Sequence, residues 1–180
     1  MTERKPGSLN RRDLMVGAAA GGLALAAGPA VAGSGAAPRH LGLDQLAKQA
    51  EVACLYHCDY GDPKRFAQTL NNINNHYAAY GADPFAIEIT LVAHAGGVKF
   101  FLADLEGTPW AGESLPPGLF ERVEALSKYG FTVRLCETTF RRNKLDPSRA
   151  RDAEFIAFVP SGVAAVAALQ SKGFAYLKVG

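Results

Sequence analysis

The chain has 180 residues, of which 48% are hydrophobic and 20% are charged, and its formal net charge is +2. This length and composition are ordinary for one globular domain with a sizeable core. Four of the 19 basic and two of the 17 acidic residues lie in the first 32 positions, so the rest of the chain carries 15 of each sign. The charge therefore favours neither a nucleic-acid partner nor an anionic membrane surface.

The N-terminal segment has the pattern of an export signal. A basic stretch that includes Arg11-Arg12 precedes the apolar run Val16 to Ala27, and Ala30 to Ala32 forms a small-x-small cleavage site. The stretch Ser8 to Met15 resembles a twin-arginine motif. The pattern predicts a twin-arginine signal peptide.

A membrane anchor is the alternative for this segment. Its apolar run is short, rich in glycine and broken by Pro29, whereas a stable membrane span needs about 20 strongly apolar residues. We therefore expect a signal peptide over residues 1–32, export to the periplasm, a linker and lead-in over 33–50, and one α/β domain over 51–180.

From Glu51 onward, strand-type runs alternate with helix-type runs, which is typical of a parallel sheet covered by helices. The first helix should start at Asp62-Pro63, an N-cap followed by proline at the first helical position. Its apolar stripe should face the sheet, and Gly81 should end it. The predicted strands are Val52–Cys58, Ala86–His94, Phe131–Leu135, Phe155–Val159 and Phe174–Val179. Further helices are expected over 97–103, 119–129 and 161–172, and a loop over 104–118.

Five strands with helical crossovers favour a flavodoxin-like three-layer sandwich. The predicted sheet is five-stranded and mainly parallel, with the strand order 2-1-3-4-5. In such sheets a ligand binds beyond the carboxyl ends of the strands, where the strand order reverses. In this order the reversal lies between the first and third strands, so the residues at these strand ends are the candidates for a site.

Two histidines and two cysteines lie at the predicted strand ends. His57 and Cys58 end the first strand, His94 ends the second, and Cys136 ends the third. Each could equally be a buried structural group, as Cys54 in mid-strand should be. Cys54 and Cys58 lie about 13 Å apart in a regular strand, beyond the roughly 7 Å that a disulfide spans. A pairing of Cys58 with Cys136 stays open.

Cys136 is the best candidate for a reactive thiol. The residues after it favour a helix, and the N-H groups and dipole of a helix N-terminus stabilise a thiolate. Arg141 and Arg142 add positive charge, whereas Glu137 opposes them. The alternative from this local pattern is a cysteine that only packs at the end of its strand.

Leu135-Cys136 followed by Arg141-Arg142-Asn143 resembles the DsrE/DsrF-like family, in which Arg-Arg-Gly follows a strand-end cysteine. The resemblance extends over Tyr56 to Pro63, Leu70 to His76, Val159 to Val163 and Gly173 to Lys178. It implies a flavodoxin-like fold, assembly into small oligomers, and a cysteine that carries persulfide between proteins. Cys136 matches that cysteine, and Asn143 stands where the family has glycine.

The leading hypothesis is a periplasmic sulfur-handling protein, either a persulfide carrier or a sulfurtransferase that uses Cys136; whether it catalyses a reaction stays open. His57 and Asp59 would orient a substrate or transfer a proton, and Arg141, Arg142 and His94 would bind the substrate. The expected partners are sulfur donor and acceptor proteins or small sulfur compounds, and the chain itself in a homo-oligomer. No cofactor is expected.

Two other functions compete with sulfur transfer. One is an exported metal-binding module in which His57, His94 and Cys136, with or without Cys58, bind copper or zinc. The other is a non-catalytic oligomeric binding protein, with the small residues Val163 to Leu169 packed between subunits.

Overall fold

The computed structural model describes residues 37–180. The predicted signal peptide over 1–32 and the first residues of the predicted linker, 33–36, lie outside the described residues. Within the described part, no helix has the length and apolar character that a membrane crossing needs.

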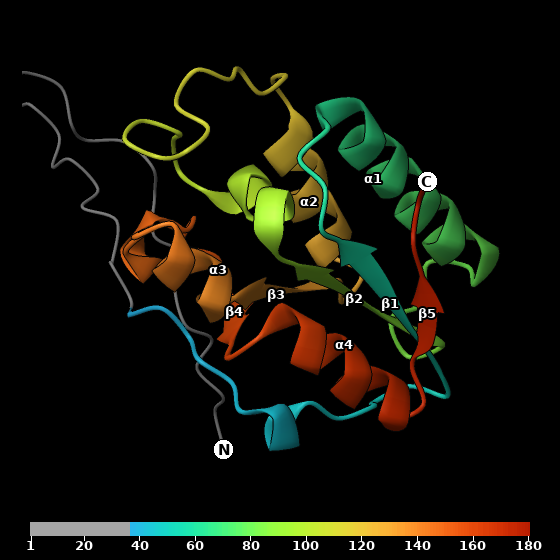
Figure 1. Ribbon diagram of the computed structural model, residues 1–180. Coiled ribbons are helices and arrows are strands. Elements are labelled where there is room, and N and C mark those ends of the chain that lie inside the picture. Colours follow the sequence, from blue (N-terminus) through green and yellow to red (C-terminus); the bar gives the residue numbers. More distant parts are fainter. Residues whose placement is uncertain (1–36) are drawn as a thin grey trace, which may run out of the picture. The chain divides into compact units, whose positions relative to one another are not determined.

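A five-stranded parallel sheet forms the centre of the domain (Figure 1). Each pair of neighbouring strands is parallel. The strands are β1 (Val52–Cys58), β2 (Ile87–Ala93), β3 (Thr132–Cys136), β4 (Ile156–Val159) and β5 (Ala175–Leu177). The five predicted strands are therefore present, with bounds that differ by at most two residues.

The strand order is β4-β3-β2-β1-β5, so the predicted order 2-1-3-4-5 is wrong. Right-handed crossovers through helices on one face add β2, β3 and β4 successively on one side of β1. The last crossover uses the opposite face and returns the chain to the free edge of β1, where β5 pairs. The order therefore reverses between β1 and β5. Sequence patterns do not reveal which face a crossover helix covers.

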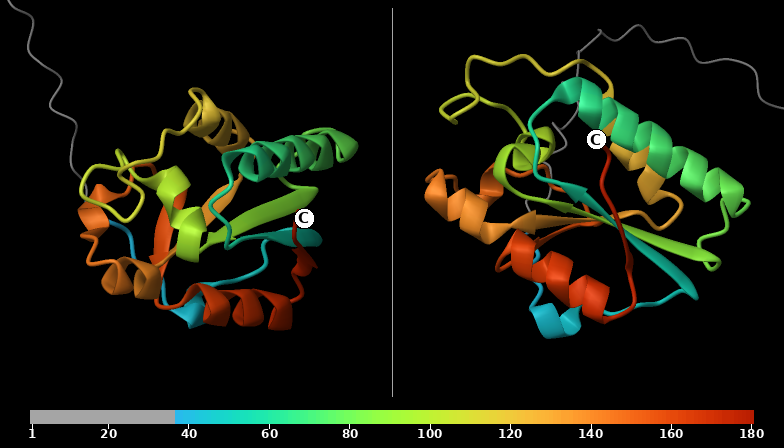
Figure 2. Two further views of the ribbon diagram at one scale, coloured as in Figure 1. Left: turned by 45° about the horizontal axis from the view of Figure 1, so that its top comes forward. Right: turned by 45° about the vertical axis from the view of Figure 1, so that its right-hand side comes forward.

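Helices cover both faces of the sheet (Figure 2). α1 (Pro63–Ala79) and α2 (Leu119–Ser127) pack side by side on one face, and α4 (Gly162–Ser171) covers the other. α1 starts as expected, because the Asp62 carboxylate accepts a hydrogen bond from the Lys64 N-H. The predicted stripe of α1 is buried, namely Phe66, Leu70, Ile73 and Tyr77. This three-layer arrangement confirms the predicted α/β sandwich.

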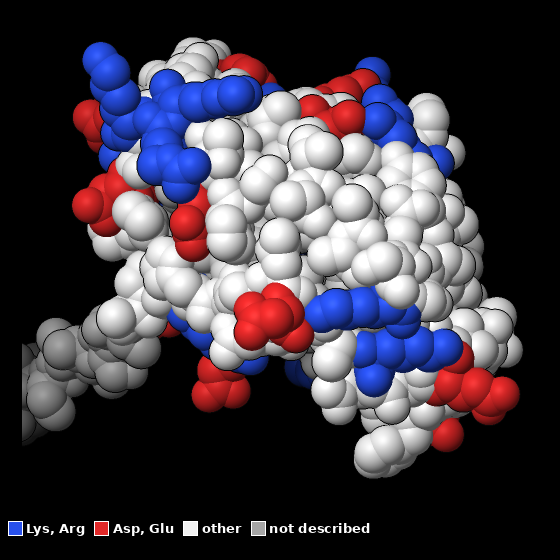
Figure 3. Space-filling model, turned by 60° about the horizontal axis from the view of Figure 1, so that its bottom comes forward, with Lys and Arg blue, Asp and Glu red and all other residues white. Residues whose placement is uncertain are grey.

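The outer face of α4 carries no charged side chain. Ala165 and Leu169 face the core, whereas Val163 remains 66% exposed. In Figure 3, which views the domain from this side, uncharged residues cover the middle and the charged ones gather around it.

The described part of the predicted linker packs on the domain. The Phe158 N-H donates to the Arg39 carbonyl at 2.7 Å, and the Leu41 N-H donates to the Phe158 carbonyl at 2.8 Å. These bonds extend the sheet beyond the edge strand β4. Lys172, the residue after α4, donates to the carbonyl of Leu43 at 2.8 Å. Leu43 is the first residue of the short 3-10 helix η1 (Leu43–Gln45).

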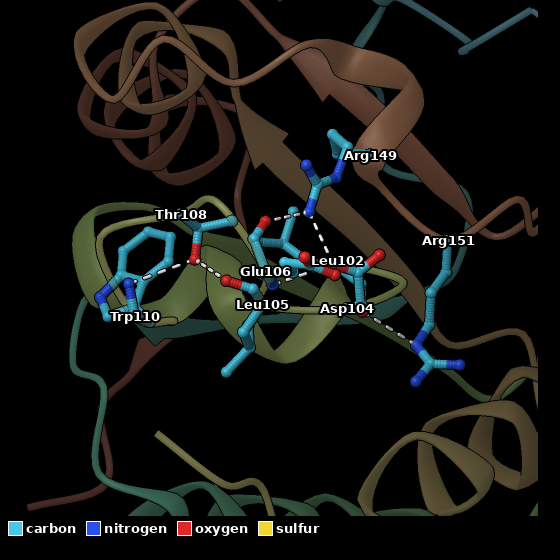
Figure 4. Close-up of polar contacts among 8 residues, drawn as sticks. All are labelled: Leu102, Asp104, Leu105, Glu106, Thr108, Trp110, Arg149 and Arg151. Atoms are coloured by element: carbon cyan, nitrogen blue, oxygen red, sulfur yellow. Dashed lines mark hydrogen bonds and ion pairs between the residues drawn. The ribbon is translucent and has the colours of Figure 1, made fainter. Parts of the chain in front are cut away.

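The loop that follows η2 (Ala95–Phe101) is held by arginines from a distant segment. Arg149, at the end of η3 (Pro147–Arg149), donates to the Asp104 carboxylate at 2.7 Å and to the Glu106 carbonyl at 2.6 Å (Figure 4). Arg151 donates to the Leu102 carbonyl at 3.2 Å. These bonds fix the first residues of the predicted loop over 104–118.

Gly97 allows η2 to lie directly on the carboxyl end of β1. A β-carbon at this position would collide with the Cys58 carbonyl and lie 2.9 Å from Cys58 Sγ. The same carbonyl accepts a hydrogen bond from the His94 N-H at 3.0 Å. Gly97 therefore sets the distance between β1 and the residues that follow β2.

We predict that Gly97→Ala lowers the free energy of unfolding by about 1–3 kcal/mol, the usual cost of overpacking. The matched control is Gly112→Ala, because a β-carbon at Gly112 meets nothing within 4 Å. Urea unfolding followed by circular dichroism measures both. Equal stability of the two variants would contradict the close packing inferred at Gly97.

Candidate functional site

Two histidines contact each other at the carboxyl ends of β1 and β2. The Nε2 atoms of His57 and His94 are 2.6 Å apart, so one imidazole donates and the other accepts. His57 Nδ1 lies 2.7 Å from the Tyr176 hydroxyl on β5. The three side chains form a continuous hydrogen-bonded chain across three strands, and Tyr176, at 40% exposed, is its solvent end.

Asp59 and Lys178 complete this group. Lys178 Nζ donates to Asp59 Oδ2 at 2.7 Å, with both side chains about one third exposed. The C-terminal segment that carries Lys178 is also held to α1, since Arg65 Nε donates to the Val179 carbonyl at 2.5 Å. We call His57, Asp59, His94, Tyr176 and Lys178 the histidine cluster.

The surroundings set the charges of the histidine cluster. Burial lowers the pKa of His57 and of His94, and the opposing effect of the Asp59 carboxylate does not outweigh it. Burial alone would raise the pKa of Asp59, but the hydrogen bond from Lys178 and the nearby His57 together lower it. At neutral pH the cluster therefore contains two neutral imidazoles and one ion pair.

A second site, the Cys136 pocket, lies beside the histidine cluster. It is a cavity of about 350 Å³. Residues 93 and 135 are paired in the β2–β3 register, which places His94 and Cys136, the next residues, next to each other. The pocket is lined by His94, Ala95, Cys136, Thr138, Thr139, Arg142, Asn143, Ser161 and Val163. His94 is thus shared by the pocket and the histidine cluster.

Close backbone approaches position His94 in the pocket wall. A β-carbon added at Gly162, the first residue of α4, would lie 2.8 Å from His94 Cβ, so only glycine leaves room for the histidine there. Ala95 adopts a left-handed conformation with φ 48°, and its N-H donates to Thr139 Oγ1 at 3.0 Å. These contacts join the ends of β2, β3 and β4.

Cys136 is buried, at 4% exposed, whereas reactive cysteines usually lie in partly exposed positions. It is the last residue of β3 and the N-cap residue of α3 (Glu137–Arg142). Because α3 has only six residues, its dipole is smaller than that of a full helix. A reactant reaches the sulfur through the pocket and not across an open surface.

The two predicted arginines differ in their placement. Arg142 lines the pocket, whereas Arg141 lies 3.7 Å from the Glu137 carboxylate and donates to Thr138 Oγ1 at 3.0 Å. Glu137 also contacts His40 Nδ1 at 2.8 Å. The Glu137 carboxylate, which was expected to destabilise a Cys136 thiolate, therefore pairs with Arg141 and His40 instead. Arg142 is the arginine positioned to meet a bound anion.

Asn143, which stands where the family motif has glycine, adopts a backbone conformation that does not require glycine. Its φ is −93° and its ψ is 6°, so the backbone has a negative φ. Its side-chain amide donates to the Thr139 carbonyl at 2.9 Å, which satisfies an acceptor at the end of α3.

The other two cysteines are enclosed. Cys54 and Cys58 are buried, and all three cysteines of the chain are free. Burial raises the pKa of the Cys58 thiol to about 12, which keeps it protonated at neutral pH. Cys136 is the cysteine that lines a pocket.

The structure therefore divides the predicted site residues into two neighbouring groups. His57, Asp59 and His94 meet in one cluster, while Cys136 lies with Arg142 on the other side of His94. Tyr176 and Lys178 were missed. The predicted order placed the last strand far from the first, so no pattern in the sequence connected these two residues with His57.

Comparisons with a protein-family profile and with solved structures agree with the α/β fold described above. The DsrE/DsrF-like family profile matches residues 52–179. A search among curated proteins finds no match. Solved structures that match include a protein of unknown function from Methanobacterium thermoautotrophicum, with 24% identity, a TM-score of 0.56, and coverage of 71% of this chain and 99% of that one. This likeness shows the fold alone.

The lowered histidine pKa values predict that the protein loses stability in mild acid. Below the ordinary histidine pKa of 6.5, the unfolded chain binds more protons than the folded one. The free energy of unfolding should therefore fall as the pH is lowered from about 7 to about 5. Urea unfolding at a series of pH values measures this slope.

The double variant His57→Gln/His94→Gln should reduce the slope without abolishing it, because burial also lowers the pKa of His76. The single variant His76→Gln is the matched control and should keep most of the slope. An unchanged slope in the double variant would assign the effect to other groups.

Proposed function

The chain belongs to the DsrE/DsrF-like family, and on this premise we propose that it carries sulfane sulfur as a persulfide on Cys136. The observation that carries the proposal is the Cys136 pocket. It combines the family's strand-end cysteine with a histidine, an arginine and hydroxyl groups around a cavity of about 350 Å³. Small ligands bind in cavities of about 300–1,000 Å³ with a few polar groups in the wall.

The transfer consists of two exchanges at sulfur. The Cys136 thiolate attacks the terminal sulfur of a donor persulfide, a new S–S bond forms, and the donor leaves as a thiolate that takes up a proton. An acceptor thiolate then attacks the outer sulfur of the Cys136 persulfide and restores the Cys136 thiolate. The sulfur atom moves without net oxidation or reduction.

Arg142 and the hydroxyl groups of Thr139 and Ser161 would hold the incoming sulfur compound. The guanidinium of Arg142 provides a positive charge for an anionic sulfur chain. Thr138 Oγ1 is already engaged, since it donates to the Pro160 carbonyl at 2.9 Å. Because Cys136 is buried, the donor that fits is a small polysulfide or a persulfide on an extended side chain.

The histidine cluster supplies a proton path to the pocket. A proton can move from the exposed Tyr176 hydroxyl through His57 to His94 by two hydrogen bonds of 2.7 and 2.6 Å. His94 lines the pocket and is neutral at pH 7, the form that can both accept and donate a proton. Asp59 stabilises an imidazolium when one forms.

The proposed place of action is the periplasm, supported by the twin-arginine pattern around Arg11-Arg12. The proposed partners are a sulfur donor, an acceptor thiol and further copies of this chain. The uncharged outer face of α4 supports self-association, because Val163 exposes an apolar side chain there.

Incubation with polysulfide should add about 32 Da per sulfur atom to Cys136, as persulfidation of a thiol requires. Mass spectrometry of the intact protein and of its peptides locates the adduct. Cys136→Ser should remove the adduct, whereas Cys58→Ser should keep it because Cys58 is enclosed. An adduct on Cys58, or none on the wild type, would exclude the proposed carrier.

The two arginines allow a matched comparison of loading rates. Arg142→Ala should slow persulfide formation roughly fivefold, which corresponds to the about 1 kcal/mol of an exposed charge interaction. Arg141→Ala, which removes the partner of Glu137, should leave the rate almost unchanged. Equal slowing in both variants would mean that general charge, and not the pocket, guides the donor.

Export is tested separately. Replacing Arg11 and Arg12 by lysine should leave an uncleaved precursor in the cytoplasm, because twin-arginine export depends on this pair. Cell fractionation with an antibody against the protein measures the distribution. Continued processing and export of the Lys-Lys variant through the twin-arginine route would show that the signal was assigned incorrectly.

A further inference from the structure

Three side chains of the histidine cluster converge at distances suited to a metal ion. One ring nitrogen each of His57 and His94 and one carboxylate oxygen of Asp59 all lie within 4.8 Å of one another, and the two Nε2 atoms are 2.6 Å apart. Two imidazole nitrogens with one carboxylate oxygen form a donor set for divalent first-row transition metals. Among residues 37–180, no other three His, Cys, Asp or Glu side chains bring their donor atoms this close.

The two imidazoles need only a small movement to accept an ion. A tetrahedral ion with bonds of about 2.0–2.1 Å holds two ligand nitrogens about 3.3 Å apart. The nitrogens are now 2.6 Å apart, joined through one proton. Both rings are half-buried at strand ends and not enclosed in the core. A shift of the shared proton from Nε2 to Nδ1 of the same ring, and a separation of less than an ångström, would make both Nε2 lone pairs available.

Neighbouring groups orient two of these ligands. His57 Nδ1 lies 2.7 Å from the Tyr176 hydroxyl, and in the tautomer whose Nδ1–H donates to that oxygen, Nε2 carries the lone pair for a metal ion. Lys178 holds Asp59 Oδ2 at 2.7 Å, so the other carboxylate oxygen remains available. Metal-binding histidines usually have their second ring nitrogen fixed by such a hydrogen bond.

We propose that His57, His94 and Asp59 bind one divalent transition-metal ion, of the zinc or copper(II) type, in place of the proton between the imidazoles. Three protein ligands leave one position of a tetrahedral ion for water or a small ligand. Cys136 is not a ligand, because it lies in the pocket on the other side of His94. The proposal goes beyond the persulfide function and does not depend on it.

Charge limits the affinity of the proposed site. Lys178 already neutralises Asp59, and the imidazoles are neutral, so the ion adds two positive charges to a nearly neutral cluster. We therefore expect weaker binding than in a structural zinc site with thiolate ligands.

The experiment is titration of the purified, metal-free domain with Zn²⁺ by calorimetry and with Co²⁺ by absorption. One ion should bind per chain. His57→Gln, His94→Gln and Asp59→Asn should each weaken binding at least about tenfold, since even changes beyond the ligands cost 10–100-fold. His76→Gln is the matched control, because this half-buried histidine contacts Tyr56 instead. Its affinity should equal that of the wild type.

The Cys136→Ser variant distinguishes the proposed site from a metal site that includes the Cys136 thiol as a ligand. The variant should bind the ion as tightly as the wild type, and the Co²⁺ spectrum should lack a thiolate-to-metal charge-transfer band. Loss of binding in Cys136→Ser, or such a band in the wild type, would overturn the assignment.

Imidazole NMR of the unaltered protein provides a test that no folding defect can obscure. Zn²⁺ should shift the ring signals of His57 and His94 and leave those of His76 and His40 in place. Absence of these shifts would also overturn the assignment. Persulfide loading of Cys136 is measured on metal-free protein, so failure of either proposal is recognised independently of the other.

Discussion

Parallel pairing of β1 with β2 on one side and β5 on the other is the constraint on which the candidate sites depend. Because all three strands run in the same direction, their carboxyl ends meet at one edge of the sheet. His57, His94 and Tyr176 come from segments up to 119 residues apart, yet they form hydrogen bonds of 2.6 and 2.7 Å. The rigid sheet orders these side chains before any ligand arrives.

His94 connects the two candidate functions. Its ring joins the histidine cluster, its side chain lines the Cys136 pocket, and Gly162 provides the space in which it packs. The space between the Nε2 atoms of His57 and His94 holds either the shared proton or the proposed metal ion, and not both at once. An ion bound by His94 would interrupt the proton path to the pocket, so metal occupancy and sulfur exchange would influence each other through one side chain.

Because Cys136 is buried, the reactivity of its thiol depends on the residues that line the pocket more than on the helix that follows it. A six-residue helix contributes little dipole, and Glu137 is occupied by His40 and Arg141. The groups left to act on the Cys136 thiol are those of the pocket wall, above all the His94 imidazole and the Arg142 guanidinium. In the proposed function, access to the thiol through a pocket would favour small or extended sulfur donors and would protect a persulfide from bulk solvent.

The sequence alone determined the elements of the fold. Periodicity, the Asp62-Pro63 start of α1 and the glycine at 81 predicted the strands and helices, because these signals act within a few residues. The strand-end residues were also recognised from the sequence, since the carboxyl ends of parallel strands share one edge.

Only the tertiary structure decided which strands are neighbours and which strand-end residues meet. The choice of sheet face by α4 placed β5 beside β1 and so brought Tyr176 and Lys178 to His57. The position of β2 between β1 and β3 also separated Cys136 from His57, with His94 between them. These outcomes depend on packing between segments up to 119 residues apart, and local sequence patterns carry no information about such packing.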